Sequence, residues 1–335
     1  METAVTAPAG SEDRPKRSRP RRAGAWAAGL LLAGVSVVVG CRAADSDGIT
    51  PVPQLLAFLP WLLAPTGLGL LLALFARRRV AMVWGVLVLG ALAWYIEPYG
   101  KTGEPTGSPV AELRVMTSNV QFGQGARALV AAVERHRPDI VFVEECEYTC
   151  SATLKKAFQG PGGVYPYRVS VEGAGSDGSV IISRFPLAVA DGVRGTMGMP
   201  GAVADVQGHA VRLQLAHPMP PLPGQVGLWR HELGELRDYA AGGKDSSTIL
   251  AGDFNASQDH AAFRRVLDTG LRDSARLAGS PRTPSWPART APALGAQIDH
   301  VLVSRDFSAN AATFLGIAGS DHRALIVHIT LHQHK

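Results

Sequence analysis

Three apolar runs near the N-terminus constrain the fold of this chain more than any other feature. Residues 23–96 are nearly all apolar, and we expect membrane-spanning helices at about 25–41, 55–75 and 80–96. The first run is at the lower limit of length for crossing a bilayer. A signal peptide is the alternative for that run, because a basic segment precedes it. Two further apolar runs follow, which favours a retained span over cleavage.

Charged residues at the ends of these runs predict how they are oriented. A basic cluster precedes the first run and should stay in the cytoplasm. The Arg triplet 77–79, which follows the second run, should lie on the same side. Asp45 and Asp47 would lie on the opposite side, together with residues 100–335. We therefore expect a multi-pass protein of the cell membrane with a cytoplasmic N-terminus and an extracytoplasmic domain. The cluster comprises Arg14, Lys16, Arg17, Arg19, Arg21 and Arg22.

The net charge of +5 is unevenly distributed along the 335 residues. Residues 1–99 hold 10 Lys and Arg against 6 Asp and Glu, whereas residues 100–335 hold 23 against 22. Domains dedicated to nucleic acid are usually strongly basic, so nucleic acid is the less favoured partner. We expect four parts: a disordered basic cytoplasmic tail (1–23), three transmembrane helices (24–96), a Pro- and Gly-rich linker (97–111) and a soluble domain (112–331).

The soluble domain has the pattern of many strands and few helices. Strands are expected at 113–120, 140–143, 179–183, 203–207, 210–215, 248–251, 297–303 and 324–331. Helices are expected at 127–137, 228–241 and 258–267, the last with Ser257 as its cap. Residues 280–292 form a long loop, in which Trp286 either acts as a lid or headgroup contact or simply covers the core.

Polar residues follow two of the apolar runs expected to be buried strands. Glu144 and Glu145 come directly after residues 140–143, and Asn119 lies at the end of the first strand. A carboxylate in such a place is costly unless it is paired or bound to a metal, and oxygen ligands suit Mg²⁺ or Mn²⁺. Alternation places only one of the two glutamates inward. The alternative is a solvated acidic loop.

Asp253 and Asn255 follow the apolar run 248–251. An aspartate at a strand end can orient or deprotonate a water molecule. An asparagine two residues later can donate hydrogen bonds to a phosphoryl oxygen as charge develops on it. The alternative is that both are ordinary turn residues beside a glycine.

Three more candidates are imidazole and carboxylate groups at strand ends. His217 ends one strand, and His322 immediately precedes the last one. If Asp299 contacts His322, it would orient the imidazole and stabilise its charged form. The neighbouring His300 should point to the opposite face. Other histidines are expected to be exposed, namely His136, His231 and His260.

Cys146 and Cys150 directly follow the glutamate pair. In an oxidising compartment they could form a disulfide, provided that the intervening segment is not a regular helix. The pattern leaves this pairing open.

Seven short segments, in this order, resemble the endonuclease/exonuclease/phosphatase superfamily, whose fold resembles that of pancreatic deoxyribonuclease I. They are residues 118–120, 143–145, 179–186, 216–217, 252–255, 298–301 and 320–322. The resemblance covers about residues 112–331. It implies a mixed α/β (α+β) domain, a four-layer αββα sandwich with the active site at one rim, here preceded by three transmembrane helices.

The resemblance also implies roles for the candidate residues. Asn119 and Glu145 would belong to the metal shell, with Asp321 near the Mg²⁺ or Mn²⁺ ion. Asp253 and Asn255 would activate water and contact phosphate. His217 and His322 would contact the scissile phosphate, with Asp299 supporting His322. The pattern leaves open whether Asp253 or His322 is the base.

Two departures from the superfamily pattern weaken the nuclease interpretation more than hydrolysis itself. Glu144 stands where many members have Gln, and no counterpart is evident for the Tyr that some DNA-repair members use as a phosphate contact.

The spans before this domain are similar to those of a narrower group, the actinomycete membrane proteins linked to teicoplanin resistance (the VanJ type). That resemblance implies a phosphatase of a phosphorylated lipid in the bilayer, such as undecaprenyl pyrophosphate, which acts in cell-wall metabolism. A surface nuclease or a phospholipid phosphodiesterase is the second hypothesis. A non-catalytic sensor or glycopeptide-binding module is the third.

Overall fold

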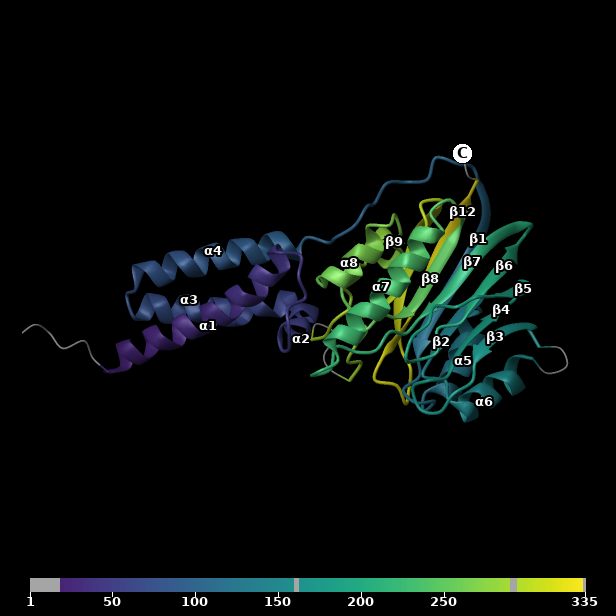
Figure 1. Cartoon of the computed structure of the whole chain (residues 1–335), viewed down its shortest axis with the longest axis horizontal. Coiled ribbons are helices and arrows are strands. Elements are labelled where there is room, and N and C mark those ends of the chain that lie inside the picture. The colour runs from purple at the N-terminus through teal and green to yellow at the C-terminus, as the bar shows by residue number, and fades with distance from the viewer. Residues whose placement is uncertain (1–18, 160–162, 290–293, 334–335) are drawn as a thin grey trace, which may run out of the picture.

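The computed structural model describes residues 19–159, 163–289 and 294–333. It has two parts, an N-terminal helical bundle and a two-sheet domain, which are joined by a linker that ends where the first strand begins at Pro109 (Figure 1). Most of the expected disordered tail lies outside the described residues. Its last part, from Arg19, is already helical, so the first helix begins earlier than predicted.

The described part of the bundle contains three α-helices of 13 to 25 residues and two short helical segments. Its elements are α1 (Arg19–Ala43), α2 (Val52–Ala57), a 3₁₀-helix (Leu59–Leu62), α3 (Leu63–Phe75) and α4 (Arg79–Ile96). Helices α1, α3 and α4 lie side by side, and α2 lies at the end of the bundle that faces the domain (Figure 1). A small apolar core that includes Leu56, Leu59 and Leu92 holds this end together.

The prediction of three spanning helices is wrong in one respect. Two helices are long and apolar enough to cross a bilayer, Pro20–Ala43 and Arg79–Ile96. The expected second span is divided into α2, the 3₁₀-helix and α3, and α3 has only 13 residues. Pro60 lies at the start of the 3₁₀-helix, and a proline lacks the N–H group that a continuous helix needs.

The domain consists of two six-stranded sheets and their flanking helices. The first sheet comprises β1 (Pro109–Asn119), β2 (Ile140–Glu144), β3 (Tyr167–Val171), β4 (Ser179–Ser183), β11 (Phe307–Gly316) and β12 (Arg323–His332). The second comprises β5 (Leu187–Ala190), β6 (Gly201–Val206), β7 (His209–Ala216), β8 (Thr248–Asp253), β9 (Arg272–Asp273) and β10 (Asp299–Val303). The helices are α5 (Ala126–His136), α6 (Tyr148–Phe158), α7 (Val226–Gly242), α8 (Ala261–Leu267) and α9 (Ser274–Leu277).

These elements form four layers, as the resemblance implied. The sheets have the strand orders β11-β12-β1-β2-β4-β3 and β5-β6-β7-β8-β10-β9, and they face each other across the largest apolar core. Helices α5 and α6 cover the outer face of the first sheet, and α7 and α8 cover that of the second (Figure 1). Each sheet contains one parallel pair, β1 with β2 and β7 with β8.

Strand pairing brings chemistry-bearing residues together at one rim. In the first sheet Asn119 is paired with Glu144 across the parallel strands β1 and β2, and in the second Asp253 is paired with Asp299 across the antiparallel strands β8 and β10. Strands β7 and β8 approach each other closely at this rim. Gly252 there has φ +150°, and a Cβ atom on it would lie 2.0 Å from the carbonyl oxygen of Ala216. Only glycine fits this position.

Polar contacts fix the bundle to the domain. The carboxylate of Asp47 accepts hydrogen bonds from the backbone N–H groups of Ala261 and Ala262, at 2.6 and 3.2 Å. Asp47 thus caps α8 from a segment more than 200 residues away, in the place where Ser257 was expected. His260 is fully buried and its Nε2 lies 2.7 Å from the carbonyl oxygen of Pro53, so its predicted exposure is wrong.

Candidate active site

The predicted site residues come from both sheets and meet at the rim beside the bundle. Within β1, β8 and β10, side chains alternate between the outer faces and the space between the sheets. Asn119, Asp253 and Asp299 are at positions whose side chains point into the space between the sheets, and all three are buried. The structure thereby brings together residues that are as much as 200 positions apart in the sequence.

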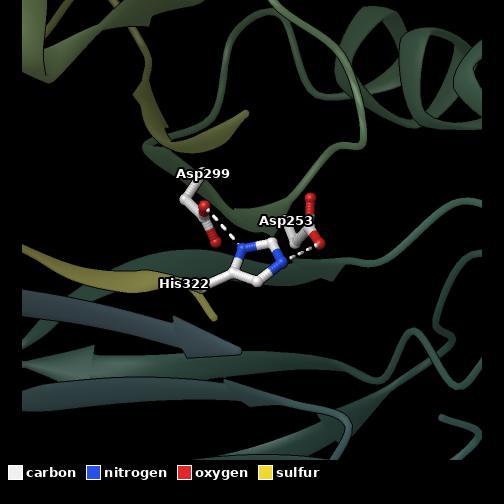
Figure 2. Close-up of side chains that lie close together, drawn as sticks. All are labelled: Asp253, Asp299 and His322. Atoms are coloured by element: carbon white, nitrogen blue, oxygen red, sulfur yellow. Dashed lines mark hydrogen bonds and ion pairs between the residues drawn. The ribbon is translucent and has the colours of Figure 1, made fainter. Parts of the chain in front are cut away.

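Asp299, His322 and Asp253 lie in line, with the imidazole of His322 between the two carboxylates (Figure 2). His322 Nδ1 lies 2.9 Å from Asp299 Oδ2, and His322 Nε2 lies 3.7 Å from Asp253 Oδ2. The hypothesised contact between Asp299 and His322 is therefore present. Burial by itself lowers the pKa of His322, but the charges of Asp299 and Asp253 outweigh it and raise the pKa to about 10. The imidazole is thus a cation at neutral pH.

Asp253 is the central carboxylate of the site. Its Oδ1 accepts a hydrogen bond of 2.8 Å from the backbone N–H of Asn255, and its Oδ2 faces both His322 and the amide of Asn119. Burial raises its pKa and the His322 cation opposes this rise, while Asp299 adds to it. A carboxylate with a raised pKa is better suited to accept a proton from water than an ordinary surface aspartate.

Asn119 and Glu145 lie on the other side of Asp253. Asn119 Nδ2 donates hydrogen bonds to Glu145 Oε1 at 3.0 Å and to Asp253 Oδ2 at 3.1 Å. Glu145 has φ +54°, an uncommon conformation for this residue type, and its Oε2 accepts a bond of 2.9 Å from the backbone N–H of Phe122. Strained backbone of this kind is often concentrated at functional sites.

This donor set fits a hard divalent cation. The carboxylates of Glu145 and Asp253 converge on one small amide group, and Mg²⁺ and Mn²⁺ prefer such oxygen ligands. A second possible set is Asp253, Asp299 and His322, whose ligand atoms lie within 4.8 Å of one another. In that set His322 Nδ1 and Asp299 Oδ2 are already hydrogen-bonded to each other, so the set around Glu145 is the favoured site for the ion.

His217 completes the rim as a buried, neutral imidazole. Its Nε2 lies 3.8 Å from Glu145 Oε1. Burial, together with the nearby His322 cation, lowers the pKa of His217 to about 3. Its Nδ1 is buried without a hydrogen-bond partner among the described residues. A neutral imidazole next to a cationic one can donate or accept a hydrogen bond without adding to the positive charge.

Asn255 and Asp321 lie at the edge of the site. Asn255 has φ +48° and its Nδ2 donates to the carbonyl oxygen of Pro218 at 3.0 Å, which fixes the side chain beside Asp253. Asp321 Oδ2 accepts a hydrogen bond of 3.1 Å from the indole N–H of Trp286. Its carboxylate is thus partnered by Trp286 in the described part of the chain, and its role as a metal ligand stays a prediction.

Glu144 is the inward member of the glutamate pair, although the predicted site gave a role only to Glu145. It continues the inward series of Ile140 and Phe142 in β2, is fully buried and accepts a hydrogen bond of 2.9 Å from Thr117 Oγ1. Burial, reinforced by the charge of Asp299, raises its pKa well above the ordinary value. The alternation itself was the available signal, because it places residue 144 between the sheets.

The site opens into a pocket of about 620 Å³. Glu145, His217, Asp253, Asn255 and His322 lie along one side of it. Further lining comes from the bundle and from two loops of the domain; of these residues only Trp286 was singled out in the sequence, as a lid or headgroup contact. These further lining residues include Thr50, Pro51, Pro53, Gln54, Ala57, Phe58, Met219, Pro220, Pro221, Leu222 and Trp286.

A disulfide lies directly beside the metal-ligand candidate. Cys146 and Cys150 are bonded, with their Cα atoms 5.1 Å apart. The bond is compatible with helix α6 because Cys146 precedes the helix and only Cys150 belongs to its first turn. The question that the sequence left open is thus answered, and the bridge anchors the segment that follows Glu145.

Comparison with known proteins agrees with this architecture. The family model described as "Endonuclease/Exonuclease/phosphatase family" matches residues 116–322. No curated protein matches the chain by sequence.

Several solved structures have a similar fold. A humanized TDP2 of D. rerio is 17% identical, with a TM-score of 0.54, over 65% of this chain and 98% of its own. D. rerio TDP2 complexed with a single-strand DNA product is also 17% identical, with a TM-score of 0.52, over 66% and 99%. A family protein of Bacteroides thetaiotaomicron is 15% identical, with a TM-score of 0.50, over 67% and 99%. At these identities the likeness concerns the fold.

Proposed function

This chain belongs to the endonuclease/exonuclease/phosphatase family, and on that premise we propose that it is a membrane-anchored, metal-dependent phosphoesterase that acts on a lipid pyrophosphate. The observation that carries the proposal is the position of the site. His322 and Asp253, with Asp299 behind His322, lie at a pocket that is also lined by residues 50–58 of the apolar bundle. A phosphate at His322 would thus be adjacent to apolar surface that continues into the bundle.

The charges of the site suit hydrolysis of a phosphate ester or anhydride. The His322 cation would contact a phosphoryl oxygen, with Asp299 holding the imidazole in place. Asp253 would take the proton of the attacking water, because His322 already carries its own proton at neutral pH. His217 and Asn255 would donate hydrogen bonds to the same phosphate.

Glu145 and Asn119 would hold the Mg²⁺ or Mn²⁺ ion, with Asp321 as a third candidate. When bound, such an ion neutralises phosphate oxygens and lowers the pKa of an attached water. The buried Glu144 would lie behind this shell and support it.

The surface of the bundle supports insertion in a membrane. Lipid-facing positions carry large apolar side chains, of which Val80 and Leu87 are 84% and 68% exposed. Trp26 and Trp94, near opposite ends of the bundle, are 75% and 78% exposed. Tryptophans at both ends of an apolar segment are typical of the two membrane–water interfaces.

The charges of the bundle support one orientation. Arg21 and Arg22 begin α1, and Arg78 lies in the turn from α3 to α4, at the end far from the domain (Figure 1). Asp45 and Asp47 lie at the end next to the domain. Basic residues favour the cytoplasmic side, so the domain would lie outside the cytoplasm. The Cys146–Cys150 disulfide agrees with an oxidising compartment.

Undecaprenyl pyrophosphate is the proposed substrate, and cell-wall metabolism with a contribution to teicoplanin-type glycopeptide resistance is the proposed role. This part of the proposal depends on the resemblance to the VanJ type of actinomycete membrane proteins. A surface nuclease or a phospholipid phosphodiesterase is the alternative, since the family includes hydrolases of both kinds.

The test is phosphate release from undecaprenyl pyrophosphate by the full-length protein in lipid nanodiscs, with Mg²⁺ or Mn²⁺ and with EDTA. His322→Ala should abolish release. His328→Ala is the matched control, because His328 is an exposed histidine on the strand that follows His322. Release that needs both metal and His322 supports the proposal. No release by folded protein would contradict it, and cleavage of single-stranded DNA or phospholipid in parallel reactions would favour the alternatives.

A further inference from the structure

Part of the wall of the catalytic pocket is built by residues outside the family domain. Residues 50–58 precede the matched region by more than 50 positions, yet Thr50, Pro53 and Phe58 line the same pocket as His322. This part of the wall therefore limits what can enter the pocket.

Four of the six pocket-lining residues of this wall are apolar, namely Pro51, Pro53, Ala57 and Phe58, and the other two are Thr50 and Gln54. The loop at residues 219–223 adds a methionine, a leucine and three prolines. We call the part of the pocket lined by residues 51–58 and 219–223 the apolar end, and the part lined by Glu145, Asp253 and His322 the charged end.

Phe58 and Trp286 join the two parts of the molecule at the apolar end. Their ring centroids are 6.2 Å apart with an interplanar angle of 53°, a tilted aromatic contact. The indole N–H of Trp286 is held by Asp321 at 3.1 Å, next to His322 in the sequence. Trp286 therefore touches the bundle with its ring and the catalytic rim with its N–H group.

The wall is fixed in position by buried polar contacts. Asp47 caps helix α8, and His260 Nε2 contacts the carbonyl oxygen of Pro53 at 2.7 Å. Gln54 Nε2 donates a hydrogen bond to the carbonyl oxygen of Pro221, which links the wall to the proline loop. A surface held on both sides in this way is preorganised, so binding to it costs little ordering.

We propose that residues 50–58, together with Trp286 and the loop at 219–223, form an apolar subsite that binds the hydrocarbon chain of an amphiphilic substrate whose phosphate lies at His322. This inference rests on the proposed phosphoesterase activity. It deepens that proposal by assigning substrate selection to the apolar lining of the pocket, part of which, residues 50–58, lies outside the family domain. The occupant is a lipid chain because the subsite is continuous with the charged end and lies at the bundle end that carries the exposed Trp94.

Prenyl pyrophosphates of increasing length test the subsite, because they share one headgroup. Binding of dimethylallyl (C5), geranyl (C10) and farnesyl (C15) pyrophosphate to the full chain in nanodiscs would be measured by calorimetry with Mn²⁺. His322→Ala protein prevents turnover during this measurement. Hydrolysis of the same series by the unaltered protein gives kcat/KM. Affinity and kcat/KM should both rise by at least about tenfold from C5 to C15, since each buried methylene adds to binding.

Variants on the wall should remove this dependence on chain length. Phe58→Ala should reduce the C15-to-C5 ratio to about threefold or less, and Ala57→Phe, which fills the subsite, should do the same. Phe75→Ala is the matched control, because Phe75 lies at the far end of the bundle and is 60% exposed. It should leave the ratio unchanged.

The outcomes separate the two proposals. Binding that strengthens with chain length, without any hydrolysis, supports the subsite and contradicts the phosphoesterase proposal. Hydrolysis at rates independent of chain length supports the activity and overturns the subsite. A chain-length dependence that Phe58→Ala and Ala57→Phe leave intact also overturns it, because the chain would then bind elsewhere.

Discussion

His322 and Asp299 form a buried ion pair, with Nδ1 and Oδ2 2.9 Å apart, between the residue that precedes β12 and the first residue of β10. The second carboxylate oxygen of Asp299 is buried and has no hydrogen-bond partner among the described residues. The pair is therefore held by one strong hydrogen bond. This hydrogen bond orients the imidazole so that its Nε2 faces the pocket, as a contact with a phosphate requires.

Asp299→Asn should reduce phosphoesterase activity by about 10²- to 10⁴-fold, because the amide cannot stabilise the imidazolium. NMR should show the pKa of His322 falling toward that of free imidazole. Asp273→Asn is the control: it removes a similar carboxylate, 2.8 Å from His300 Nδ1, from a histidine outside the pocket. An unchanged rate in Asp299→Asn would contradict the role given to the pair.

The raised pKa of His322 should make stability depend on pH in the metal-free protein. Its folded-state pKa of about 10 exceeds the value of about 6.5 expected when unfolded. The pairing therefore stabilises the fold fully below about pH 6.5, and this contribution decreases until it is lost above about pH 10. Urea unfolding of the unaltered protein with EDTA at several pH values measures it, and His322→Ala should remove that part of the dependence.

Glu145→Gln should weaken binding of Mn²⁺ and leave the fold intact. In the unaltered protein, cation at a hundredfold excess over Kd should raise the free energy of unfolding by about 2.7 kcal/mol. This increase should be small in Glu145→Gln. Glu235→Gln, at an exposed position of α7, is the control. If Asp299→Asn abolishes binding and Glu145→Gln does not, the ion binds at the Asp253, Asp299 and His322 set instead.

The disulfide predicts the number of reactive thiols. Denatured, unreduced protein should react with one equivalent of maleimide, at Cys41, and with three after reduction. Cys146→Ser with Cys150→Ser should lower the free energy of unfolding by about 2 kcal/mol, because the closed loop is short. It should also weaken Mn²⁺ binding, since the bridge anchors the residue that follows Glu145. Three reactive thiols before reduction would contradict the bond.

The proposed orientation predicts which positions are accessible from outside intact cells. In a Cys41→Ser background, Lys244→Cys in the domain should react with a membrane-impermeant maleimide, and Arg78→Cys in the turn before α4 should not. Lysed cells should label both, which controls for reactivity. Labelling of position 78 in intact cells would contradict the orientation.

The sequence predicted the part of this site that depends on local patterns. The apolar runs placed Asn119 and Asp253 at strand ends and Asp299 at a strand start, and a parallel and an antiparallel strand pair bring them to one rim. Alternation indicated that only one of Glu144 and Glu145 points inward, and the structure shows that it is Glu144. Fold class and layer order followed from the resemblance.

Other features depend on contacts between distant segments, which no local pattern encodes. Asp47 and Ala261 are 214 positions apart, and Pro53 and His260 are 207 apart. The pocket wall and the burial of His260 both result from these contacts. The interruption of the second span, in contrast, has a cause within the local sequence. Pro60 lies inside that apolar run, and it cannot donate the backbone hydrogen bond that a continuous helix needs.

The Asp47 cap on α8 has a consequence for which headgroups the protein can process. Because the domain is joined to the bundle by buried bonds as well as by the linker, His322 would stay at a constant height above the bilayer if the bundle is inserted as proposed. The protein would then select phosphates that lie at that height over those carried higher by a longer headgroup or lower by a shorter one.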